Sequence, residues 1–172
     1  MRKLIVIGTI HGMTPEAELN KVLEKYAPAQ LLVEIAHDDL TKDLSKYPVE
    51  MIYAYNWAKK KGIPVAGFDS KINELKEGLS LEYLKKVDSE EERLLKKFTW
   101  IDLNKEKNNK KTDTPLIKSI IDEKKARDRE IEMLANIKKK LIAKGKILIL
   151  TGCSHLAFFE EKLKDAQFPF RT

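Results

Sequence analysis

The chain has 172 residues, of which 42% are hydrophobic and one is cysteine, and its formal net charge is +6. A chain of this length buries roughly 70% of its unfolded surface, enough for one domain without a disulfide or structural metal. The single cysteine excludes an internal disulfide, and no apolar run approaches the roughly 18 residues of a membrane span. The apolar part of the N-terminus, residues 4–7, is too short for a signal peptide. We therefore expect a cytoplasmic protein without membrane attachment.

The excess positive charge lies in the middle of the chain. Residues 70–146 hold 21 of the 33 basic and 15 of the 27 acidic residues, which leaves 12 of each sign elsewhere. Both signs are interleaved along this segment, as on solvated helix faces. This pattern disfavours a phosphate-binding surface, so we expect no specific nucleic-acid partner and keep nucleic-acid binding as the least favoured alternative.

Four short apolar runs predict the strands of a mainly parallel α/β sheet flanked by helices. They are residues 4–7, 31–35, 64–68 and 147–150. None alternates strictly with polar residues, as expected when helices cover both faces of a sheet. A first helix is expected to begin at Thr14-Pro15-Glu16, capped by Thr14, and a second to span about residues 48–61.

Residues 70–145 contain no convincing strand and are predicted to form a helical insertion or cap within a single domain, residues 1–172. The polar run 104–111 indicates an exposed connection. A long helix is expected from Pro115 to about Lys144, with Gly145 ending it. The sequence leaves open whether this insertion is a lid, a homodimer interface or both.

Two strand ends carry the same motif, Gly-x-x-His. Residues 8–11 read Gly-Thr-Ile-His, and residues 152–155 read Gly-Cys-Ser-His. Ligands of open parallel sheets bind beyond the carboxyl ends of the strands, and glycine permits a close approach of the backbone there. His11 and His155 are therefore candidate functional residues, and two unrelated loop histidines are the alternative.

Acidic residues lie near the ends of the other two strands. Glu34 lies inside the apolar run 31–35, and Asp69 directly follows the run 64–68. A carboxylate in so apolar a strand is costly unless a cation, a hydrogen-bond donor or a metal pairs with it. Together with His11 and His155, these two residues would form a mixed imidazole and carboxylate set suited to Mn²⁺, Co²⁺, Zn²⁺ or Fe²⁺. For Asp69, a helix or turn cap is the alternative.

The last predicted helix places an arginine in its apolar stripe. Arg127 shares that stripe with five apolar residues, Leu116, Ile120, Ile131, Leu134 and Leu141. Arg129 falls on the opposite side and is expected to face solvent. A buried arginine would pair with a carboxylate or an anionic substrate group, or extend to the surface. His37, after the second strand, is a further candidate for the site.

Together, the two Gly-x-x-His motifs, Glu34, Asp69 and Arg127 resemble the TraB/PrgY and Tiki superfamily, which includes erythromycin esterase and the ChaN haem-binding lipoproteins. The resemblance implies an α/β core with helical insertions and an Mn²⁺- or Co²⁺-dependent peptidase. It also implies that His11, Glu34 and His155 are metal or catalytic residues, with Arg127 as the helix arginine of the family. Because members of this group differ in chemistry, the fold alone does not define the reaction.

We therefore predict a metal-dependent hydrolase that cleaves a peptide or ester bond in a peptide or small-molecule substrate. His11, Glu34 and His155 would hold Mn²⁺, Co²⁺ or Zn²⁺, with Glu34 or Asp69 as general base. Arg127 would hold an oxyanion or a substrate carboxylate. The alternative is a binding protein without turnover, for haem or another anionic small molecule. Cys153 is expected to be a buried thiol rather than a nucleophile.

Overall fold

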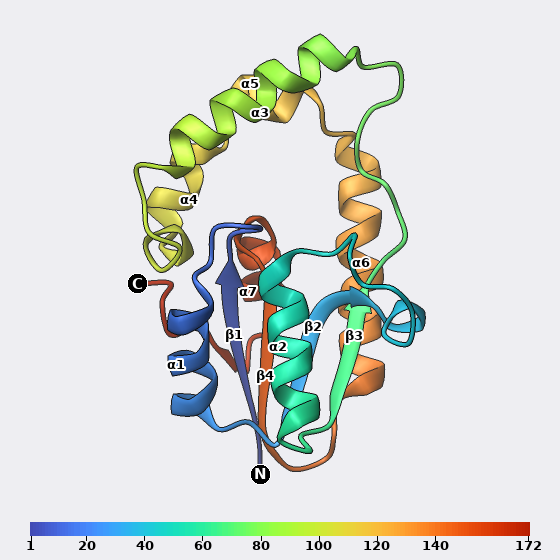
Figure 1. Ribbon diagram of the computed structural model, residues 1–172, viewed down its shortest axis with the longest axis vertical. Coiled ribbons are helices and arrows are strands. Elements are labelled where there is room, and N and C mark those ends of the chain that lie inside the picture. The colour runs from blue at the N-terminus through green and yellow to red at the C-terminus, as the bar shows by residue number, and fades with distance from the viewer.

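A five-stranded, all-parallel sheet lies at the centre of the computed structural model, which describes residues 1–172 (Figure 1). Its strands are β1 (Arg2–Thr9), β2 (Gln30–Ala36), β3 (Val65–Asp69), β4 (Gly145–Gly152) and β5 (Ala166–Gln167), in the order β3-β2-β4-β1-β5. The predicted fold class, a mainly parallel α/β sheet flanked by helices, is confirmed. The four apolar runs form the four long strands, whereas the short edge strand β5 was not predicted.

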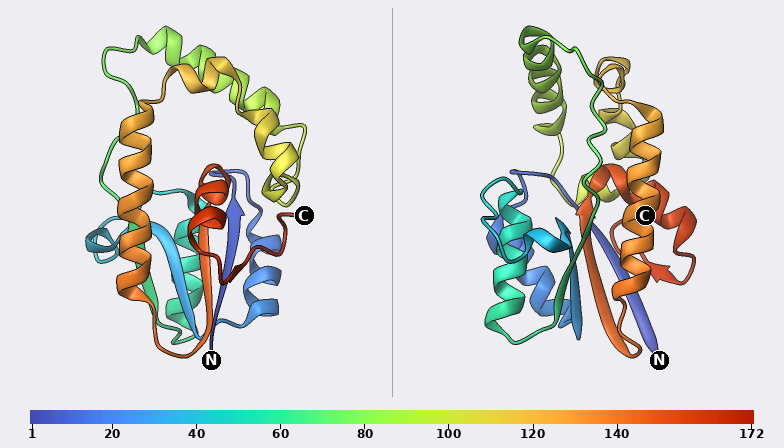
Figure 2. Two further views of the ribbon diagram at one scale, coloured as in Figure 1. Left: turned by 180° about the vertical axis from the view of Figure 1, so that it is seen from behind. Right: turned by 90° about the vertical axis from the view of Figure 1, so that its right-hand side faces the viewer.

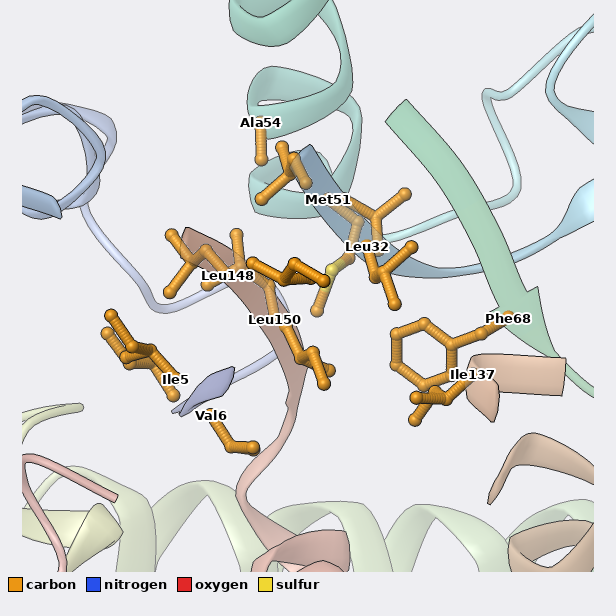
Figure 3. Close-up of a cluster of buried hydrophobic side chains, with 14 of the residues drawn as sticks. Ile5, Val6, Leu32, Met51, Ala54, Phe68, Ile137, Leu148 and Leu150 are labelled. Carbon is orange, nitrogen blue, oxygen red and sulfur yellow. The ribbon is translucent and has the colours of Figure 1, made fainter. Parts of the chain in front are cut away.

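Helices cover both faces of the sheet, which explains why its strands lack polar alternation. Helices α1 (Glu16–Tyr26) and α2 (Val49–Lys60) lie on one face, and α6 (Glu123–Lys140) and α7 (Leu156–Lys162) lie on the other (Figure 2). Side chains from both layers fill the core, among them Met51 of α2, Leu32 of β2 and Ile137 of α6 (Figure 3). Each fully buried side chain of this kind contributes about 1.5–3 kcal/mol to folding.

None of the helices has the length and apolar character needed to cross a membrane.

The start of α1 differs from the sequence prediction in a way that shapes the site. Pro15, rather than Thr14, occupies the cap position, and no side chain caps the helix. The Thr14 hydroxyl instead accepts a hydrogen bond from the Ile10 N–H (2.8 Å) and donates one to the Ile10 carbonyl (3.1 Å). Thr14 therefore closes the turn that follows β1, and this turn carries His11.

The segment between β3 and β4 forms an arch of helices beyond the carboxyl ends of the strands (Figure 1). We call residues 70–122 the arch. It contains α3 (Leu81–Leu95), a 3₁₀ turn (Asp102–Asn104), α4 (Glu106–Thr112) and α5 (Pro115–Ser119). Helix α6 then returns the chain along the sheet to β4.

The exposed connection predicted at residues 104–111 is wrong, because this run forms the end of a 3₁₀ turn and helix α4, and Asn104 is buried. The Asn104 side chain accepts a hydrogen bond from the Gly8 N–H (2.8 Å) and donates one to the Gly8 carbonyl (2.9 Å). Strand β4 pairs with this end of β1 on one edge, but β5 pairs only with Leu4 and Ile5 and leaves the other edge of Gly8 without a strand. The amide of Asn104 supplies the missing partner.

The long helix predicted from Pro115 to Lys144 is also wrong, since the structure divides it into α5 and α6. Ile121 forms an isolated antiparallel bridge with Leu75. The Asp122 side chain then accepts a hydrogen bond from the Lys125 N–H (3.0 Å) and caps α6. Such a cap starts a new helix at Asp122, so residues on the two sides of the break do not share one helical phase.

Replacing Asn104 by alanine should lower the free energy of unfolding by about 1–3 kcal/mol, because two buried backbone groups of Gly8 lose their partner. Urea denaturation of the variant beside wild type measures the change. Asn56→Ala is the matched control: Asn56 is exposed on α2, and its loss should change stability by less than about 0.5 kcal/mol. Equal stability of the Asn104 variant and wild type would contradict the role given to this amide.

Candidate functional site

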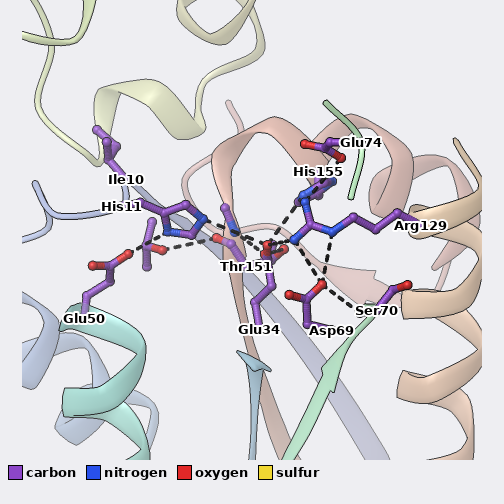
Figure 4. Close-up of polar contacts among 12 residues, drawn as sticks. Ile10, His11, Glu34, Glu50, Asp69, Ser70, Glu74, Arg129, Thr151 and His155 are labelled. Carbon is purple, nitrogen blue, oxygen red and sulfur yellow. Dashed lines mark hydrogen bonds and ion pairs between the residues drawn. The ribbon is translucent and has the colours of Figure 1, made fainter. Parts of the chain in front are cut away.

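A buried carboxylate, Glu34 in β2, lies at the centre of a polar network at the carboxyl end of the sheet (Figure 4). Only 3% of the residue is exposed. Its Oε2 accepts hydrogen bonds from the Thr151 hydroxyl (2.6 Å) and the Gly152 N–H (2.7 Å), both at the end of β4. Its Oε1 accepts one from Nη2 of Arg129 (3.1 Å). Both oxygens of Glu34 thus accept hydrogen bonds, and these offset the cost of burying its charge.

Both histidines of the Gly-x-x-His motifs direct Nε2 toward Glu34. The distances to Glu34 Oε1 are 4.0 Å from His11, which follows β1, and 3.6 Å from His155, which follows β4. The Nδ1 atom of each ring lies against a second carboxylate: Glu50 at 2.8 Å from His11, and Glu130 at 3.1 Å from His155. These carboxylates hold the two rings so that their Nε2 atoms converge on one oxygen.

The motif glycines allow this close packing. A Cβ on Gly152 would lie 3.3 Å from Nε2 of His11, and a Cβ on Gly8 would lie 2.7 Å from Cδ1 of Leu156. Because the side chains approach the backbone so closely, any larger residue at either position would displace a neighbour.

Arg129 of α6 joins the ends of β2 and β3. Its Nε and Nη2 donate to Oδ1 of Asp69 (3.1 and 3.0 Å), and its Nη1 lies 3.2 Å from Glu74 of the arch. Its side chain is 17% exposed. Arg129, which the sequence analysis placed in solvent, is therefore the buried arginine of this site.

The expectation that Arg127 would be buried at the site is wrong. Its side chain is 49% exposed, lies 3.8 Å from Glu130 and stacks over the ring of Phe158 at 4.8 Å. The predicted stripe continued through Ile131 of α6, but Ile131 is 52% exposed. The buried residues of α6, Met133 and Ile137, lie four and eight residues after Arg129, so Arg129 and not Arg127 shares their face.

The structure thus brings His11, Glu34, Asp69 and His155 together, and it leaves His37 exposed in a 3₁₀ turn outside the network. Glu50 and Glu130 were not predicted, because in the sequence they resemble ordinary helix charges. Glu50 is fully buried, on the same face of α2 as Ala54, and its contact with His11 is a tertiary one that no local pattern indicates.

Carboxylates outnumber arginine at the site. Glu34, Asp69 and Glu74 contact Arg129, whereas Glu50 and Glu130 contact the two histidines. Such an excess of negative charge in a partly dry environment is stabilised by additional cations. Protonated imidazoles or a bound metal ion would supply them.

The pKa values of the central groups follow from this charge balance. Burial disfavours the charge of Glu34, but His155, His11, the Thr151 hydroxyl and Arg129 outweigh burial and lower the pKa of this carboxyl. Burial likewise opposes the charge on His11 and His155, yet hydrogen bonds and nearby carboxylates raise the pKa of both imidazoles. The site therefore favours an anionic Glu34 facing positive charge.

Burial and the charge of Glu34 raise the pKa of Asp69, against the effect of Arg129. This carboxyl therefore holds a proton more readily than an ordinary aspartate does.

A cavity of about 400 Å³ lies beside the network, between the strand ends and the arch. His11 lines it with a side chain that is 48% exposed, whereas the side chain of His155 is only 7% exposed. A larger groove of about 690 Å³ lies between α1 and α2 and contains none of the network residues. The smaller cavity is therefore the one through which a ligand could reach the network.

The imidazole nitrogens and carboxylate oxygens at this site are of the donor types that bind divalent cations. Metal-binding histidines usually donate their second ring N–H to a carboxylate, as Nδ1 of His11 and Nδ1 of His155 are placed to do here. Two metal bonds of about 2.1 Å span at most about 4.2 Å, and the two Nε2 atoms lie within that span of Glu34 Oε1. No three acidic, histidine or cysteine side chains already surround a common metal position, and Arg129 shares the same oxygen of Glu34.

No family model, curated protein or solved structure matches the chain. The geometry of the site therefore carries the functional inference.

The two arginines should differ in their effect on stability. Arg129→Gln should lower the free energy of unfolding by about 3–5 kcal/mol, because it leaves Glu34, Asp69 and Glu74 without their shared cation. Arg127→Gln removes one long surface ion pair and should lower it by no more than about 1 kcal/mol. Denaturant unfolding at pH 7 measures both changes. Equal losses for the two variants would contradict the assignment of Arg129 to the buried network.

Cys153 should behave as an inert thiol in the folded protein. Burial raises its pKa to about 12, so the neutral thiol persists through pH 8 and its stabilisation of the fold is lost only as pH rises toward that value. Labelling by an aromatic disulfide reagent at pH 8 should be at least about tenfold slower in the native protein than in urea. Labelling at the same rate in both states would show that this thiol is exposed and reactive.

Proposed function

We propose that the protein is a metal-dependent hydrolase of the TraB/Tiki type that cleaves a peptide or ester bond. One observation supports this proposal above all others: two imidazole Nε2 atoms converge on the buried oxygen of Glu34, with each Nδ1 held by a carboxylate. We include in the proposal a peptide or small-molecule substrate and a cytoplasmic location.

In this proposal His11, His155 and Glu34 hold the cation. A divalent cation in this position supplies Lewis-acid polarisation of a carbonyl group and activation of water at neutral pH. Mn²⁺, Co²⁺ and Zn²⁺ all accept such a mixed nitrogen and oxygen donor set. Glu50 and Glu130 orient the two rings and select the tautomer that leaves Nε2 free to bind.

Asp69 is the better candidate for the general base. Both oxygens of Glu34 accept hydrogen bonds, whereas Arg129 and the Ser70 N–H donate to Oδ1 of Asp69 and leave Oδ2 free. The raised pKa of Asp69 is nearer to the working pH, which favours proton transfer.

The anion-holding role expected of Arg127 is dropped, because this residue lies on the outer side of α6. Arg129 does not replace it, since three carboxylates already occupy its donors. The residues that border the cavity from the site are His11 and the loop after β4. A substrate would therefore approach from the side of His11.

The alternative, a binding protein for haem or another anionic molecule, has less support. Five carboxylates contact Arg129 or the two histidines, and such an excess of negative charge repels anions. The same charge excess attracts cations, which favours the metal-dependent function.

Elemental analysis tests the metal site. Purified protein is dialysed against trace Mn²⁺, Co²⁺ and Zn²⁺, and wild type should retain near-stoichiometric metal. The His11→Ala/His155→Ala double variant should retain none, because it lacks both nitrogen ligands. His37→Ala is the matched control, since His37 is exposed outside the network and its loss should leave the metal content unchanged.

Hydrolysis provides the second readout of the same prediction. Metal-loaded wild type and His37→Ala should hydrolyse members of a panel of nitrophenyl esters and short peptides, and the double variant should lose at least about a hundredfold in rate. Absence of metal from wild type, or equal metal content and equal hydrolysis in the double variant, would refute the proposed function.

A further inference from the structure

The cavity beside His11 has an apolar wall and lacks basic residues. Its apolar lining comes from Ile10, Leu95, Leu103 and Ile117. No lysine or arginine lines it, although residues 70–146 carry the entire net positive charge of the chain. The side chains of the lining that can carry a charge near neutral pH are Glu91, Asp113 and His11.

Glu91 of α3 is an exposed residue whose carboxylate lines the cavity without an ion pair. The acidic residues on both sides of it are paired on the helix surface: Glu90 with Arg93 at 2.9 Å, and Glu92 with Lys96 at 2.8 Å. Glu91 forms neither a hydrogen bond nor an ion pair. Partial desolvation and the neighbouring Asp88 raise the pKa of its carboxyl.

The other acidic residue of the lining is already neutralised. Asp113 lies 2.9 Å from the ammonium group of Lys118. The imidazole of His11 faces Glu50 and Glu34, which balance its charge. Glu91 is thus the one carboxylate of the lining that forms no ion pair, although the charge of the nearby His11 opposes the rise in its pKa.

Helical spacing places this carboxylate beside apolar surface. Leu95 lies four residues after Glu91 in α3, so the two side chains lie on the same face of the helix and both line the cavity. A carboxylate next to aliphatic walls is complementary to an ammonium group next to an aliphatic side chain. This combination occurs in an amino acid amide or peptide with a free amino group.

We propose that the cavity binds substrates with a free ammonium group beside an aliphatic side chain, and that Glu91 determines this specificity. This inference rests on the proposed function, because it places the bond to be cleaved next to His11. The ammonium group would donate charge-assisted hydrogen bonds to Glu91, and the aliphatic part would contact Leu95, Leu103 and Ile117.

Calorimetric titration of the purified protein with two probes tests the inference. L-leucinamide carries the ammonium group, and N-acetyl-L-leucinamide has the same side chain without the charge. At pH 7 wild type should bind L-leucinamide at least about tenfold more tightly than the acetylated probe. Glu91→Gln should abolish this preference, while the control Glu92→Gln should retain it.

Equal binding of the two probes by wild type, no binding of either probe, or an unchanged preference in Glu91→Gln would each overturn the inference. These outcomes are independent of the metal and hydrolysis measurements. Metal-dependent hydrolysis without an ammonium preference would leave the proposed function intact and refute the role of Glu91. A preference that depends on Glu91, in a protein without metal or hydrolysis, would refute the hydrolase and retain the ligand class.

Discussion

A single negative charge inside the sheet sets the conditions for the rest of this structure. Glu34 lies in a strand whose every residue is buried, where an unpaired carboxylate would be strongly unfavourable. Several elements donate hydrogen bonds to this carboxylate: β4 provides the Thr151 hydroxyl and the Gly152 N–H, and α6 provides Arg129. Two histidines complete the shell, and their positive charge lowers the pKa of Glu34 while Glu34 raises theirs. The network is therefore one electrostatic unit rather than a set of separate pairs.

Much of this unit could be predicted from the sequence for a geometric reason. In a parallel sheet all carboxyl ends lie at the same edge, so residues that follow different strands meet whatever the strand order. His11, Glu34, Asp69 and His155 lie near one another for that reason, although the order β3-β2-β4-β1-β5 was not predicted. The apolar runs located the four long strands because strands covered on both faces leave a strong hydrophobic signal. The metal ion and the hydrolytic reaction stay predictions.

The parts that could not be predicted depend on tertiary contacts. Asn104 lies in a run as polar as a surface loop, and it is buried only because it pairs with Gly8, 96 residues away in the chain. Arg129 rather than Arg127 joins the site because the face of α6 that carries Met133 and Ile137 packs against the sheet, whereas Ile131 of the predicted stripe is exposed. Local propensity contains no information about such long-range partners.

The strand order also has a consequence for how the chain folds. Strand β1 begins at Arg2, but its two partners, β4 and β5, begin at Gly145 and Ala166. During synthesis β1 therefore stays unpaired until β4 and β5 have been made. Closing so long a loop makes folding slow, and an exposed apolar strand invites association with other chains. The charged, lysine-rich arch lies between β1 and these partners in the sequence, and its charge would help to keep the partly folded chain in solution.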